Sequence, residues 1–150
     1  MVLLVVKYIH ILAAIVAVGF NISYAVWIIR ARRNPEHTAF ALKGVKFLDD
    51  RIANPSYGVL LLTGIAMVFL AGYSLTTLWI DISLVLFVLL IVVAVVFYTP
   101  SLRDQIKLVE SGDTSSAEFT RLAQRGQVAG QALGVIVLVI LAMMVFQPNL

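Results

Sequence analysis

The chain has 150 residues, of which 61% are hydrophobic and only 13% are charged, with a formal net charge of +3. A soluble domain has about 45–50% apolar and about 25% charged residues, so this composition excludes a soluble globular enzyme and a disordered chain. Cysteine is absent, which excludes disulfide bonds, zinc–thiolate sites and thiol redox chemistry. The remaining classes are a small integral membrane protein and a very apolar oligomer.

Four apolar stretches are long enough to cross about 30 Å of hydrocarbon, which takes about 20 helical residues. They cover residues 2–29, 55–72, 78–98 and 128–146. The β-branched runs in the last two are also typical of buried strands, but only a helix satisfies its own backbone groups in lipid. The sequence therefore predicts an all-α, four-helix transmembrane bundle that forms a single domain over residues 1–150.

The first span carries one narrow stripe of polar and small side chains on an otherwise Val-, Ile-, Leu- and Phe-rich helix. In lipid such a stripe is expected to face the other helices. At 100° per residue the stripe contains His10, Ala14, Ala17, Asn21 and Tyr24, with Lys7 at its margin.

His10 is the side chain in this stripe that can bind a metal or a haem iron, because a neutral imidazole is a common axial ligand. Ala14 and Ala17 would leave room for a flat macrocycle, Asn21 would form part of the pocket wall, and Lys7 would pair with a propionate. The alternatives are a hydrogen bond from His10 to a neighbouring helix, a Lys7 side chain that extends to the interface or pairs with Asp81, and an interhelical hydrogen bond from Asn21.

Between the first two spans, the sequence predicts a short interfacial helix. Asn34-Pro35-Glu36 is typical of a helix start, and Ala41, Val45 and Leu48 follow at helical spacing. Asn54-Pro55 repeats the start signal and is expected to begin the second span.

Thr99-Pro100 is expected to end or kink the third span and to open a short helix that Gly112 stops. Ser115 and Glu118 have the spacing of a capping box. No proline lies between Glu118 and Pro148, so the fourth span is expected to be the outer part of one long helix.

The fourth span begins with Gly126, Gly130 and Gly134, each four residues apart. This glycine ridge permits close contact between helices. It is compatible with packing inside the bundle and with a homodimer, which we include in the prediction.

The charges predict the orientation. Ten of the eleven lysine and arginine residues lie in the segments 30–54 and 99–127, and the short link between spans two and three has none. The positive-inside rule therefore places both segments in the cytoplasm and both termini outside, in a multi-pass protein of the cell (inner) membrane. The basic pI follows from this topology and does not indicate nucleic-acid binding.

Over nearly its whole length the chain resembles the predicted integral membrane proteins grouped as domain of unknown function 2269. The resemblance rests on the ordered pieces Lys7-Tyr8-Ile9-His10-Ile11-Leu12, Asp49-Asp50, Asn54-Pro55, Thr63-Gly64, Trp79, Pro100 and Met143-Met144-Val145-Phe146-Gln147-Pro148. The family name implies membrane insertion and no activity.

About the first 20 residues are also similar to the first helix of CopD-type copper-resistance proteins and HemJ-type protoporphyrinogen oxidases. That similarity implies a metal or haem role for His10 alone. The chain has Asn21-Ile22-Ser23-Tyr24 where HemJ-type proteins have a basic and aromatic run, so protoporphyrinogen oxidation is not implied.

The leading functional hypothesis is a haem b-binding membrane protein, either an electron carrier or a haem sensor, with His10 as axial ligand. The alternatives are a structural or accessory membrane subunit without cofactor, and a permease for a small ligand or ion. Hydrolytic enzymes are not predicted, because the chain lacks a phosphate loop, an HExxH motif and a serine nucleophile elbow.

Overall fold

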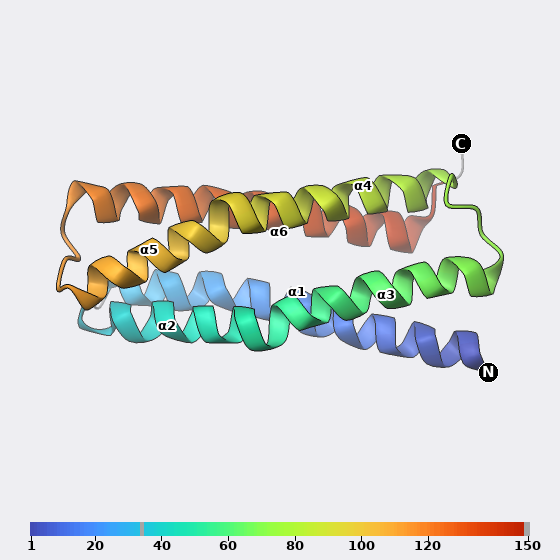
Figure 1. Cartoon of the computed structure of the whole chain (residues 1–150), viewed down its shortest axis with the longest axis horizontal. Coiled ribbons are helices and arrows are strands. Elements are labelled where there is room, and N and C mark those ends of the chain that lie inside the picture. The colour runs from blue at the N-terminus through green and yellow to red at the C-terminus, as the bar shows by residue number, and fades with distance from the viewer. Residues whose placement is uncertain (34, 149–150) are drawn as a thin grey trace.

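The computed structural model describes residues 1–33 and 35–148, and these residues form helices joined by short turns. The chain forms four long, uninterrupted helical segments, which we call rods (Figure 1). The elements are α1 (Val2–Arg33), a 3₁₀ turn (Pro35–His37), α2 (Thr38–Leu48), a π-helical turn (Asp49–Ala53), α3 (Asn54–Ala71), α4 (Leu78–Val93), a second π-helical turn (Ala94–Tyr98), α5 (Thr99–Glu110) and α6 (Ala117–Phe146).

Each rod is long and apolar enough to cross a membrane, and the part of the chain that the structure describes contains no strand. The predicted all-α fold with four spans is therefore confirmed. The second rod is α2, the first π turn and α3 without interruption, and the third is α4, the second π turn and α5.

The four rods pair as two hairpins. In one hairpin α1 packs on α3 and α2, and in the other α6 packs on α4 and α5. Contacts between α2 and α5 join the hairpins, with a smaller contact between α1 and α6. Figure 1 shows the two hairpins as two layers, with both termini and the α3–α4 turn at one end.

The rods are longer than a bilayer requires. They have 30 to 34 residues, hence a length of roughly 45–50 Å, whereas about 20 residues cross the hydrocarbon core. The excess lies at the end opposite the termini, where α2, α5 and the adjoining ends of α1 and α6 contain most of the cations. The predicted short helix is therefore present as α2, but it continues into α3 as part of the same rod.

Asn54-Pro55 begins α3, the second span, as predicted, but α3 is not a separate helix, because α2 continues into it through the π turn. Asn54 has right-handed helical dihedral angles, and its amide bonds to the Asp49 carbonyl five residues earlier. The proline lacks the N–H that would bond to the carbonyl of Arg51, and the π turn accommodates this loss without ending the helix. The Asn54 side chain bonds to the Asp49 carboxylate at 3.4 Å and caps nothing.

Thr99-Pro100 produces the expected irregularity, again with a π turn in front of it. Pro100 cannot donate a hydrogen bond to the carbonyl of Val96. That carbonyl accepts one from the Arg125 guanidinium on α6 at 3.3 Å, and the same guanidinium lies 5.4 Å from the centre of the Phe97 ring. Arg125 thus replaces the backbone donor that the proline removes.

We expect Arg125→Leu to lower the free energy of unfolding by about 1 kcal/mol, because a charged hydrogen bond and a cation–π contact are lost. The cost should shrink when Pro100→Ala restores an amide donor to Val96. Unfolding by SDS in mixed micelles, followed by circular dichroism, measures both effects. Arg121→Leu is the matched control, and equal costs of Arg125→Leu in both backgrounds would contradict this role.

The helix ends agree with the sequence in part. Gly112 follows α5 with a φ of 83°, which favours glycine, and α6 is one long helix, as predicted. The predicted cap at Ser115 is wrong by one residue, because the Ser116 hydroxyl accepts the bond from the Phe119 amide at 3.0 Å. Hydrogen bonds from Ser116 also lower the pKa of Asp113. The predicted start at Asn34 lies outside the described residues.

Candidate functional site

The stripe on α1 faces α3, as its composition predicts. The Nδ1 atom of His10 lies 2.8 Å from the Thr63 hydroxyl oxygen on α3. The next residue, Gly64, allows this approach, because a Cβ atom there would lie 3.3 Å from His10 Cε1. Thr63-Gly64 therefore forms a close-fitting contact for one edge of the imidazole ring.

The hydrogen-bond network indicates which nitrogen of His10 carries the proton. The Thr63 hydroxyl donates to the Val59 carbonyl at 2.6 Å, within its own helix. With its proton used there, the hydroxyl is available to accept from His10, and on this basis we assign the proton to Nδ1 and the lone pair to Nε2. Histidines that bind metals have this arrangement, in which one nitrogen donates to a protein acceptor and the other is free to bind.

The other proposed haem contacts on α1 differ in their surroundings. Ala17 has no exposed surface, and Ala14 is half-buried. Lys7 is exposed near the N-terminal end, and Asp81 is also exposed. Among the ion pairs between described residues, neither Lys7 nor Asp81 takes part, so the Lys7–Asp81 pair is not formed.

Asn21 forms the interhelical hydrogen bond that was its alternative role. Its amide donates to the Tyr57 hydroxyl on α3 and to the Ala17 carbonyl at 2.9 Å. Asn21 also lines a cavity about 200 Å³ in volume, whose lining includes neither His10 nor the two alanines. The lower end of the stripe therefore belongs to a second polar region.

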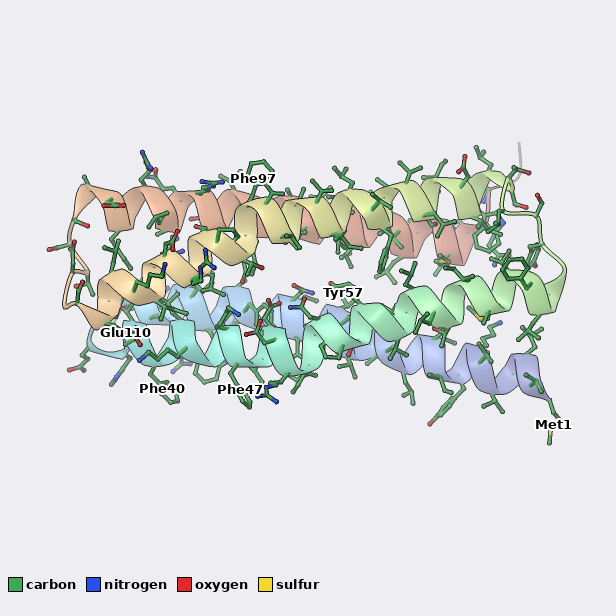
Figure 2. The ribbon with its side chains drawn as sticks, in the orientation of Figure 1. Met1, Phe40, Phe47, Tyr57, Phe97 and Glu110 are labelled. Carbon is green, nitrogen blue, oxygen red and sulfur yellow. The ribbon has the colours of Figure 1, made fainter. Side chains whose placement is uncertain are left out.

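This cavity lies between the two hairpins, next to both π turns, and Tyr57 lies between the layers in Figure 2. Its lining is mostly apolar, with a smaller group of polar side chains. The polar side chains are those of Asn21, Asp49, Asn54, Tyr57 and Tyr98; the other lining residues are Gly58, Leu61, Phe87, Leu90, Ile91, Ala94, Val95 and Leu133.

Asp49 is the carboxylate of this region and is only 7% exposed. The adjacent Asp50 is more exposed and pairs with Lys46. Tyr24, which does not line the cavity, is 3% exposed, and its hydroxyl has no hydrogen-bond partner among the described residues. Sequence reasoning placed Tyr24 on the stripe but missed Asp49, Tyr57 and Tyr98 as members of one polar cluster.

The glycine ridge packs inside the chain at two of its three positions. A Cβ atom at Gly126 would lie 3.2 Å from Ser101 Oγ and from Gln105 Nε2, and one at Gly130 would lie 3.6 Å from the Tyr98 ring. Gly134 has no heavy atom of a neighbouring element within 4 Å of the same position. Packing within the bundle is therefore confirmed at Gly126 and Gly130, while a homodimer stays a prediction.

Fold and composition together define a small, four-span integral membrane protein. The sequence model described as "Predicted integral membrane protein (DUF2269)" matches residues 4–148, so the chain belongs to that family, as its sequence suggested. No curated protein and no solved structure matches the chain at a significant level.

Proposed function

We propose that this membrane protein binds haem b through the Nε2 atom of His10 and serves as an electron carrier or a haem sensor. The observation that supports this function is the hydrogen bond that commits Nδ1 to Thr63 and leaves Nε2 with its lone pair. Ionisable side chains inside a membrane span are rare and costly, which favours a functional role. Haem, when bound, supplies one-electron redox chemistry at an iron tuned by its axial ligand.

The surroundings of His10 suit an axial haem ligand. They do not form the full haem pocket that was expected from the sequence. Thr63 fixes the ring, and Lys7, one helical turn away and exposed, is available for a propionate. Ala17 is covered by its neighbours and offers no surface to a macrocycle in this arrangement of α1 and α3. The proposal therefore depends on His10 and Thr63, with Lys7, Ala14 and Asn21 as secondary contacts.

The absorption spectrum of the detergent-purified protein tests this function. We expect a Soret band, as purified or after haemin addition, that is lost in His10→Ala. His37→Ala is the matched control, because His37 is the other histidine of the chain and lies exposed in the short turn before α2. A protein that stays colourless after haemin addition, or a band that survives in His10→Ala, would contradict the proposal.

The accessory-subunit function is the second candidate. It is favoured by the contacts that Asn21, Gly126 and Gly130 make within the chain, which explain several of the unusual residues through packing alone. A colourless protein with normal stability would support it. A homodimer that packs through Gly134, the open position of the glycine ridge, is compatible with either function.

We also propose that both termini lie on the outer side of the cell membrane and that the segments 30–54 and 99–127 lie on the cytoplasmic side. The chain has no cysteine, so single cysteines report position without background. Thr76→Cys, in the exposed α3–α4 turn, should react with a membrane-impermeant maleimide in intact cells. Ser115→Cys, in the exposed α5–α6 turn, should react only after lysis. The reverse pattern would contradict this orientation.

A further inference from the structure

The cavity between the hairpins contains a buried carboxyl group, that of Asp49, which forms no ion pair with a described residue. Asp49 is buried, takes part in none of the ion pairs among described residues, and receives one long hydrogen bond from Asn54. The ammonium group of Lys46, one turn away on the same rod, pairs with Asp50. A buried carboxylate without a cation is costly, so a cavity lined by one favours a ligand that brings positive charge.

Another buried polar group of this region, Tyr24, lies outside the lining of the cavity. Its hydroxyl is fully buried without a hydrogen-bond partner, although buried hydroxyls nearly always have one. Tyr57 and Tyr98, unlike Tyr24, line the cavity together with Asp49. Two phenol groups and one carboxyl group are therefore within reach of a hydrogen-bonding ligand in this space.

Most of the cavity lining is apolar and includes aromatic rings. The Tyr57 ring meets the Phe87 ring edge-on, with centroids 6.2 Å apart, and Leu90 and Leu133 also line the space. A cavity of roughly 150 Å³ holds benzene, so about 200 Å³ suits a molecule of one ring or a short branched chain. Aromatic faces also attract organic cations.

We propose that this cavity binds a small organic ammonium ion, whose cationic group donates hydrogen bonds to Asp49 and to the tyrosine hydroxyls while its hydrocarbon part contacts Phe87. A divalent metal is less suited, because Asp49 is the single carboxylate in the lining and the described residues contain no cluster of three acidic or histidine ligands. His10 does not line the cavity, so this inference is independent of haem binding.

Isothermal titration of the full-length protein in detergent tests the proposal with 2-phenylethylammonium as the probe. The neutral isostere 2-phenylethanol and sodium chloride are the ligand controls. We expect saturable, one-site binding of the ammonium ion and at least about tenfold weaker binding of the alcohol, because the charge-assisted hydrogen bonds are lost. Absence of ammonium binding, equal binding of the alcohol, or full competition by equimolar sodium chloride would overturn the proposal.

Asp49→Asn removes the charge and keeps the shape, and we expect it to weaken ammonium binding at least about tenfold. Asp50→Asn is the matched control, since Asp50 is adjacent in sequence and pairs with Lys46 outside the cavity. If Asp49→Asn fails to fold by circular dichroism, Tyr57→Phe serves instead and is expected to weaken binding severalfold. Wild-type affinity in the folded Asp49 variant, or in Tyr57→Phe where that variant serves, would overturn the proposal.

Discussion

Replacing Gly126 with leucine is expected to destabilise the protein by about 3 kcal/mol or more. The added side chain would begin 3.2 Å from Ser101 Oγ and Gln105 Nε2, which is closer than ordinary van der Waals contact, so both side chains would have to move. Ser101 is 1% exposed, and its hydroxyl donates to the Leu122 carbonyl at 2.6 Å. Overpacking costs about 1–3 kcal/mol, and each buried polar group that loses its partner costs about 1–3 kcal/mol more.

The matched control for this variant is Gly134→Leu, on the same helix and in the same four-residue repeat. No neighbouring side chain approaches a Cβ atom at Gly134, and leucine is a better helix former than glycine by about 0.8 kcal/mol. We expect its unfolding in SDS to match or exceed that of the wild type. Similar losses in both variants would contradict the assignment of the ridge to intramolecular packing.

The same pair of variants also tests the homodimer. If two copies associate through the exposed part of the ridge, Gly134→Leu should lower the dimer fraction while the monomer stays folded. Size-exclusion chromatography with light scattering measures this fraction. An unchanged mass would exclude Gly134 from any dimer interface.

Thr63→Val is expected to weaken haem binding about 10- to 100-fold without unfolding the protein. Valine has nearly the shape of threonine but removes the acceptor of the His10 Nδ1–H bond, and loss of such a partner lowers metal affinity by this factor. Haemin titration followed at the Soret band measures the change.

Ser83→Ala is the control for Thr63→Val. Ser83 is a buried hydroxyl in a different span, on α4, and it bonds to the Trp79 carbonyl of its own helix. We expect haem affinity in this variant to equal that of the wild type. If Thr63→Val binds haem as well as the wild type does, the tautomer assigned to His10 is wrong.

The spans and the face of α1 that packs against α3 follow from the sequence, because in lipid the backbone must form helices and the polar side chains must avoid the lipid tails. The predicted second span matches α3 within one residue. The predicted third span matches α4 together with the second π turn. The stripe from His10 to Asn21 contacts Thr63 and Tyr57, as its composition indicates.

The polar cluster around Asp49 could not be predicted in the same way. Asn54-Pro55 has the ordinary signature of a helix start, so the sequence places Asp49 before the second span and gives it no role in a buried site. Only the π turn, which lets the helix continue through the proline, places this carboxylate beside Tyr24 and Tyr57. The sequence pattern does not distinguish such a continuous helix from one that starts at the proline.

The most direct test of the haem proposal is chemical rescue of His10→Gly by free imidazole. Removing the side chain should abolish the Soret band, and millimolar imidazole should restore it by occupying the vacated position. The same treatment of His37→Gly should change nothing, because that variant keeps the ligand. A His10→Gly protein that binds haem with wild-type affinity without imidazole would contradict His10 as the axial ligand.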